Sequence, residues 1–197
     1  MGRYGDMAYN LFMFPFEALV LHRFRKSILG MAEGKVLEVG SGTGVNFKYY
    51  DSEKIDELSV IDLPSRKFSI SDKAGRMKPD GIFEGSVEKL PFPDGYFDTV
   101  VFTLVFCSVA DAAEGIDEIH RVLGKGGRIL FIEHVLPRTR FARIAAEKAN
   151  DAWNGFSNGC NINRETLTAI EKAGFGIIDG TYARKGVFIK GAAEKRQ

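Results

Sequence analysis

The sequence predicts an α/β fold, a mostly parallel sheet of seven strands with helices on both faces. One observation behind this prediction is that short apolar runs alternate with helical patterns, as in parallel strands joined by crossover helices. A second is that only Ala183-Arg184-Lys185 separates the last two apolar runs, which is too short for a crossover helix. These two runs are therefore expected to form an antiparallel C-terminal hairpin.

The individual elements follow from composition and periodicity. The predicted strands are 36–39, 58–62, 82–84, 97–105, 128–135, 176–182 and 186–190. Between the fourth and fifth strands, one helix face is formed by Ile116, Ile119, Val122 and Leu123, and the glycines at 124, 126 and 127 are expected to end that helix.

Two further helices are predicted before the hairpin. The first has an apolar face of Phe141, Ile144, Ala145, Ala149 and Ala152. The second has Asn163 as its N-cap and ends at Gly174. The stretch 153–161 between them is expected to be a loop, either a pocket wall or a turn whose aromatic side chains plug the edge of the core.

The stretch Glu38-Val39-Gly40-Ser41-Gly42-Thr43-Gly44 indicates a ligand site. It follows the first predicted strand, and alternating glycines suit a sharp turn that a ligand can approach closely. A helix is expected to follow, with its free N–H groups directed at the ligand. The dinucleotide fingerprint G-x-G-x-x-G does not fit, because Gly44 comes one place early and Val45 occupies the position of the third glycine.

Asp62 ends the second predicted strand, 22 residues after Gly40. A carboxylate at this place is suited to accept hydrogen bonds from the two hydroxyls of a ribose. An ordinary solvated aspartate at a strand end is the alternative.

Composition excludes several classes of protein. The 197 residues carry a net charge of +1 and a hydrophobic content of 45%, so one domain is expected, without the basic footprint of a nucleic-acid-binding protein. Two cysteines make no disulfide framework and fit a reducing compartment. We therefore expect a cytoplasmic location. For the oligomeric state, we expect a monomer or a weak dimer.

The first 30 residues are apolar but interrupted, with Glu17 inside the run and a basic cluster after it. The run is too short to span a membrane and lacks the order of a signal peptide. We expect residues 1–30 to form a helical lid over the site, with contact to a membrane surface as the alternative.

Most of the chain resembles the class I S-adenosylmethionine (AdoMet) methyltransferases, a Rossmann-like family. The pattern E-x-G-x-G-x-G is similar to their motif I, and residues 85–98 and 121–127 resemble two later segments. More narrowly, residues 37–50, 103–109 (TLVFCSV), 133–135 (EHV) and 159–161 (GCN) are similar to the thiol S-methyltransferase branch. Ser86 departs from the family pattern, in which many relatives carry Asp.

The resemblance implies roles for particular residues. AdoMet would be bound by Glu38, Gly40, Ser41, Gly42, Gly44, Asp62, Leu63, Ser86, Val87 and Thr103. The acceptor pocket would involve Phe12, Phe16, His134, Trp153 and Cys160, in part through a helical insertion at 136–165. His134, at the end of the fifth strand, is the candidate general base, with a structural histidine as the alternative.

The predicted activity is methyl transfer from AdoMet to a small molecule, such as a lipophilic thiol. A quinone precursor and a phospholipid headgroup are alternative acceptors. A nicotinamide-dependent oxidoreductase and an AdoMet-binding module without catalysis are alternatives of other classes. No metal is expected at the site.

Overall fold

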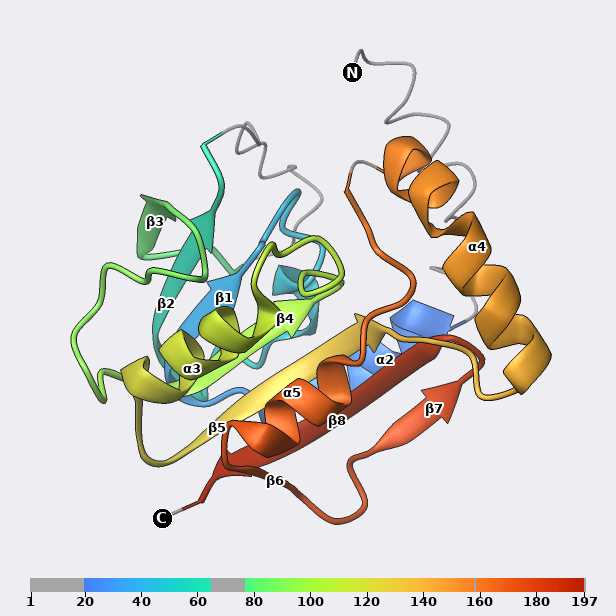
Figure 1. Cartoon of the computed structure of the whole chain (residues 1–197). Coiled ribbons are helices and arrows are strands. Elements are labelled where there is room, and N and C mark those ends of the chain that lie inside the picture. The colour runs from blue at the N-terminus through green and yellow to red at the C-terminus, as the bar shows by residue number, and fades with distance from the viewer. Residues whose placement is uncertain (1–19, 65–76, 158, 197) are drawn as a thin grey trace.

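The computed structural model describes residues 20–64, 77–157 and 159–196, and Figure 1 shows its elements around one central sheet. The strands are β1 (Gly34–Val39), β2 (Ile55–Asp62), β3 (Gly81–Glu84), β4 (Phe97–Thr103), β5 (Leu123–His134), β6 (Phe175–Ile177), β7 (Ala183–Lys185) and β8 (Phe188–Lys195). The helices are α2 (His22–Ile28), α3 (Ala112–Val122), α4 (Arg140–Phe156) and α5 (Thr166–Lys172), with short 3₁₀ helices η2 (Leu29–Met31) and η3 (Phe47–Tyr49).

The strand order is β3-β2-β1-β4-β5-β8-β6, with β7 paired to β8. The five strands β3 to β5 in this order are parallel, and β8 runs antiparallel to β5, β6 and β7. The predicted fold class is therefore confirmed. The order reverses between β1 and β4, and open α/β sheets bind ligands beyond the carboxyl ends of the strands at such a point.

The C-terminal hairpin differs from the prediction in detail. Ala183–Lys185, expected to be the connection, is itself strand β7, so the described sheet has an eighth strand. Lys185 pairs with Phe188, and Gly186 between them has φ +63°, as a tight two-residue turn requires. β6 ends at Ile177 instead of Tyr182 and pairs with the far end of β8, where Phe175 lies opposite Lys195.

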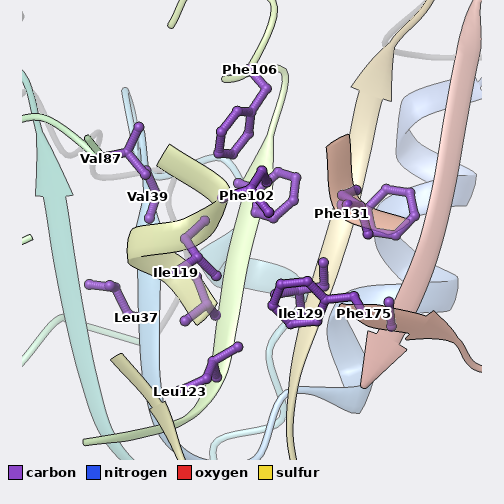
Figure 2. Close-up of a cluster of buried hydrophobic side chains, with 14 of the residues drawn as sticks. Leu37, Val39, Val87, Phe102, Phe106, Ile119, Leu123, Ile129, Phe131 and Phe175 are labelled. Carbon is purple, nitrogen blue, oxygen red and sulfur yellow. The ribbon is translucent and has the colours of Figure 1, made fainter. Parts of the chain in front are cut away.

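Each face of the sheet buries its own apolar layer. On the face covered by α3 and α5, Phe102, Ile129 and Phe131 pack with Ile119 and Phe175, as Figure 2 shows. The alternating residues of the same strands point to the other face, where α2 covers them. Because of this alternation, successive side chains of β5 lie on opposite faces of the sheet.

The glycines after α3 do not act as a helix stop. α3 begins at the N-cap Asp111, whose carboxylate accepts hydrogen bonds from the N–H groups of Ala113 and Glu114. The helix ends at Val122, and β5 starts at Leu123, so the glycines at 124, 126 and 127 lie within the strand. The pairing of Leu123 with Phe97 begins the strand five residues earlier than the prediction.

Residues 20–31 form part of the core, on the second face of the sheet. Val20, Leu21, Phe24 and Ile28 are buried there against β5 and β8. This part of the expected 1–30 lid therefore covers the sheet. Residues 1–19, with Phe12 and Phe16, lie outside the described residues. Over the described ranges, no helix combines the length and the apolarity that crossing a membrane requires.

α4 includes the residues from Trp153 to Phe156, which were expected to be a loop. Its predicted apolar face is largely exposed: Phe141 is 86% and Ile144 is 44% accessible. After α4 the chain turns at Ser157, and α5 has Glu165 as its N-cap, instead of Asn163. The prediction placed this helix start too early because Asn163 has the residue type that N-caps prefer.

Candidate functional site

The glycine loop after β1 has the backbone conformation that its sequence indicates. Gly40, Gly42 and Gly44 have φ values of +67°, +54° and +72°, a left-handed conformation that other residues resist. A Cβ on Gly40 would lie 2.6 Å from Cγ2 of Val105, whereas one on Gly42 would meet no described atom within 4 Å. The loop therefore packs against Val105, just after β4, at Gly40, and it is open at Gly42.

The helix expected after this loop does not form in the described structure, and η3 is the only helical turn between the loop and β2. Side chains from this segment are bonded instead to Glu38, since Asn46 donates to its Oε1 (3.0 Å) and Tyr50 to its Oε2 (2.5 Å). The chain between η3 and the start of β2 at Ile55 forms turns. The backbone N–H groups at this place therefore belong to a loop and not to the terminus of an α-helix.

Asp62 lies at the end of β2 beside the loop. Its Oδ2 accepts a hydrogen bond from the N–H of Gly42 (3.0 Å), and its Oδ1 accepts one from Leu63 (2.8 Å). Each carboxylate oxygen has a second lone pair, so both remain able to accept from a ligand hydroxyl. Leu63 is 44% exposed next to it, as an apolar surface for a flat ring requires.

Glu38 is buried at 1% exposure beneath the loop. Burial raises its pKa to about 7, although the hydrogen bonds from Tyr50 and Asn46 and the charge of Arg25 oppose this shift. Glu38 and Gly44 are not among the residues that line the pocket described below. The position of Glu38 beneath the loop, with hydrogen bonds from Asn46 and Tyr50, indicates that it supports the loop.

Arg25 is a site residue that sequence reasoning did not identify. Its side chain is 3% exposed, lines the pocket and donates from Nε to Oδ1 of Asn46 (2.8 Å). The basic cluster after the apolar start was visible, but only the docking of α2 selects which of its members points inward. A buried guanidinium is the group suited to bind a carboxylate.

These groups surround a cavity of about 400 Å³ at the β1/β4 reversal. Of the predicted cofactor residues, its lining includes Gly40, Ser41, Gly42, Asp62, Leu63, Ser86, Val87 and Thr103. The hydroxyl of Ser41 is buried without a hydrogen-bond partner among the described residues. This orphan hydroxyl, the open face of Gly42 and the nearby carboxylate and guanidinium fit a ligand with a ribose and an amino acid, as AdoMet has.

Two polar residues complete the lining. The Oγ of Thr103 accepts a hydrogen bond from Asn46 (3.0 Å) and so joins the network around Glu38. Ser86 donates to Oε2 of Glu88 (2.6 Å), and the N–H of Asp111 donates to its Oε1 (2.7 Å). The bond from Asp111 and then the bond from Ser86 lower the pKa of Glu88. Ser86 therefore orients an ionised carboxylate in the lining of the pocket.

The expected acceptor residues are divided between the two faces of β5. His134 packs against Phe188, with ring centroids 5.5 Å apart, whereas the preceding residue, Glu133, points to the opposite face, toward Cys160. Burial lowers the pKa of His134 to about 4. His134, Trp153 and Cys160 are not among the lining residues of the cavity.

Cys160 and Cys107 are both free and buried, and their thiols are hydrogen-bonded. The bond from Cys107 lowers the pKa of Cys160 to about 7, while the same bond and burial raise the pKa of Cys107. Within the described residues, no cluster of His, Cys, Asp or Glu could hold a metal ion.

The strand order and the glycine loop are those of the class I AdoMet-dependent methyltransferase fold. Residues 37–131 match the family model described as a methyltransferase domain. Among solved structures, an AdoMet-dependent methyltransferase from Mesorhizobium loti has a TM-score of 0.62 and 17% identity, over 88% of this chain and 96% of that one. The cyclase SpnF has a TM-score of 0.65 and 17% identity, over 89% of this chain and 79% of that one. These likenesses show the fold.

Among curated proteins, the chain is similar to human thiol S-methyltransferase TMT1A, with 34% identity over 147 residues. That match covers 71% of this chain and 59% of the human protein. Rat thiol S-methyltransferase TMT1B is 32% identical over 73% of this chain and 60% of its own length. The ubiquinone/menaquinone C-methyltransferase UbiE of Geotalea daltonii is 29% identical, over 57% of this chain and 51% of its own length. The chain thus spans about three fifths of the thiol S-methyltransferases it matches.

Proposed function

We propose that this protein transfers a methyl group from AdoMet to a small lipophilic thiol. The observation that carries the AdoMet part is the cavity at the β1/β4 reversal, where an orphan hydroxyl, a carboxylate and a buried guanidinium surround an open glycine. The thiol part is supported by the similarity to the TMT1 thiol S-methyltransferases and by the apolar wall of Leu104, Val105 and Val109.

In this proposal, each end of the cofactor has its own binding group. Asp62 accepts hydrogen bonds from the ribose hydroxyls, and Leu63 packs on the adenine. Arg25 binds the carboxylate, while the Ser41 hydroxyl and the loop N–H groups hold the rest of the amino-acid part. When bound, AdoMet supplies a methyl group already activated by its sulfonium.

The chain then has to align the acceptor and exclude water from it. Alignment of two reactants can contribute about 7–11 kcal/mol to the barrier reduction. A neutral imidazole with a pKa of about 4 is a weak base, so we assign the rate chiefly to alignment and thiolate formation to the acidity of the thiol itself. We further propose that the insertion at 136–165 covers the acceptor, and that residues 1–19, whose sequence is rich in apolar side chains, contribute to its binding.

The first test separates AdoMet from a nicotinamide cofactor. S-adenosylhomocysteine at a hundredfold excess over Kd should add about 2.7 kcal/mol of stability. For a chain of this size, the melting temperature should rise by about 5–10 °C. NAD should leave it unchanged. A shift with NAD and none with S-adenosylhomocysteine would refute the assignment of the cavity.

The second test compares thiophenol, phenol and aniline, which share one ring and differ in the acceptor atom. Transfer of radiolabelled methyl should be fastest to thiophenol. A naphthoquinol serves as the acceptor that the UbiE similarity suggests, and an aminolipid as the headgroup alternative. Transfer to either of these with none to thiophenol would overturn the thiol assignment and leave the AdoMet assignment in place.

A further inference from the structure

Three segments that resemble the thiol S-methyltransferase branch meet at one place in the fold. They are residues 103–109 after β4, Glu133 near the end of β5, and Asn161 in the loop after α4. All three converge on the turn formed by residues 104–107, which we call the β4 turn. The cofactor cavity itself does not account for this convergence, since neither Glu133 nor Asn161 lines it.

The β4 turn forms one wall of the cavity through Leu104 and Val105. Leu104 has φ +57°, and it is the one non-glycine residue with a positive φ in the described part of the chain. Such a conformation costs about 1–2 kcal/mol for a residue with a Cβ, so surrounding contacts must hold it. One such contact is the hydrogen bond from its N–H to the carbonyl of Ile132 (2.8 Å).

Glu133 holds the middle of the turn. Its Oε1 accepts hydrogen bonds from two successive N–H groups, those of Val105 (3.0 Å) and Phe106 (3.2 Å). The residue is fully buried, and burial raises the pKa of its carboxyl to about 8. Burying a carboxyl group is unfavourable unless it is hydrogen-bonded, and the hydrogen bonds of Oε1 are both made to the turn that forms the cavity wall.

Asn161 holds the end of the turn. Its backbone N–H and its Nδ2 both donate to the carbonyl of Cys107, at 2.8 Å and 3.1 Å. Its Oδ1 accepts from Asn150 (3.2 Å) and Asn154 (3.0 Å), both of which lie on α4. The β4 turn is therefore bonded through Asn161 to the insertion that we propose to cover the acceptor.

We propose that Glu133 and Asn161 are positioning residues that clamp the β4 turn. They thereby hold this wall of the cavity in the position that methyl transfer from cofactor to acceptor requires. Glu133 sets the wall against the glycine loop, where Val105 contacts Gly40. Asn161 couples the same wall to α4. The proposal rests on the proposed function for its reaction, but the clamp also has consequences for cofactor binding and for exchange of the turn amides, which need no acceptor.

The test uses the full chain and four variants. Glu133→Leu removes the acceptor at similar size, whereas Glu133→Gln keeps an amide oxygen for both N–H groups. Asn161→Asp removes the Nδ2 donor, while its backbone N–H and Oδ1 remain. Ile129→Ala is the matched control, because Ile129 is fully buried on the same face of β5 as Glu133 and its side chain has no group that could hydrogen-bond to the turn. All measurements are made below the melting transition of every variant.

Glu133→Leu should speed hydrogen exchange at the amides of Val105 and Phe106 and weaken S-adenosylhomocysteine binding by about tenfold, since a misplaced wall fits the ligand less well. Turnover of thiophenol should fall further, by about 100-fold, because transfer requires closer alignment than binding does. Asn161→Asp should lower turnover about tenfold and leave cofactor affinity within about threefold. Glu133→Gln should recover most of each loss, and Ile129→Ala should lower the melting temperature alone.

The clamp is refuted if Glu133→Leu changes affinity and turnover no more than Ile129→Ala does. It is also refuted if the double variant of Glu133→Leu and Asn161→Asp shows strictly independent losses, because residues that hold one turn should be non-additive. If the wild type binds S-adenosylhomocysteine but methylates no thiol, the thiol assignment fails, and exchange and affinity still decide the role of the clamp. If the wild type binds no cofactor, the proposed function fails, and the exchange measurement alone decides it.

Discussion

Substitution of Asp62 tests the cofactor assignment most directly. The carboxylate has two tasks in the structure, since Oδ2 already accepts from the N–H of Gly42 (3.0 Å) and both oxygens retain a lone pair for a ribose hydroxyl. Asp62→Ala removes both tasks together. Asp62→Asn keeps one carbonyl oxygen and the size of the side chain but removes the charge.

The magnitudes follow from these contacts. Loss of a charge-assisted hydrogen bond costs about 1.5–3 kcal/mol, which is about 10- to 150-fold in Kd. Asp62→Asn should therefore weaken binding within this range. Asp62→Ala should weaken it further, because the N–H of Gly42 loses its partner and the loop loses its anchor. Loss of this part-buried hydrogen bond adds about 0.5–1.5 kcal/mol.

The assay is calorimetry with two ligands. S-adenosylhomocysteine has the ribose, the adenine and the amino acid, and 5′-methylthioadenosine has the first two without the amino acid. Both ligands should lose affinity by the same factor with Asp62→Asn. Unchanged Kd values for both would mean that the ribose is bound elsewhere. A loss for S-adenosylhomocysteine alone would place Asp62 at the other end of the cofactor.

Four further outcomes are expected. Arg25→Met should weaken S-adenosylhomocysteine by at least about tenfold while the Kd of 5′-methylthioadenosine stays unchanged, because the guanidinium is assigned to the carboxylate; an equal loss for both ligands would contradict this. Deletion of residues 1–19 should lower methyl transfer more than cofactor affinity, and full activity of the truncated chain would remove these residues from the proposal. His134→Gln should lower turnover by less than about tenfold, whereas a loss of about 10²–10⁴-fold would identify a general base. The same variant should lose less stability in acid than the wild type. The pKa of His134 is about 4 in the folded chain and 6.5 in the unfolded chain, so the unfolded chain binds more protons between these values. The wild type therefore loses stability as pH falls from 6.5 to 4. Chemical denaturation should show this difference growing to about 3 kcal/mol across that window, and a constant difference would show that His134 titrates normally.

Much of the fold and one half of the site follow from local sequence. The strand–turn pattern around Gly40 and the strand end at Asp62 were predicted at the places where the structure has them, because left-handed glycines and strand-end carboxylates leave a signature within a few residues. Boundaries that depend on pairing were less well predicted. β7 was missed because three residues become a strand only when β8 pairs with them.

The other half of the site was decided by tertiary structure. Arg25 reaches the cavity only because α2 docks on β5 and β8, and no local pattern distinguishes it from the other basic residues of its cluster. Glu133 and Asn161 are far apart in the chain, and both meet the turn after β4 only once the sheet and the loop after α4 are assembled. Sequence determined which residues suit a turn, a strand end or a ligand, because those preferences are local. Tertiary packing determined which side chains share a cavity, because that depends on contacts between segments that the sequence leaves far apart.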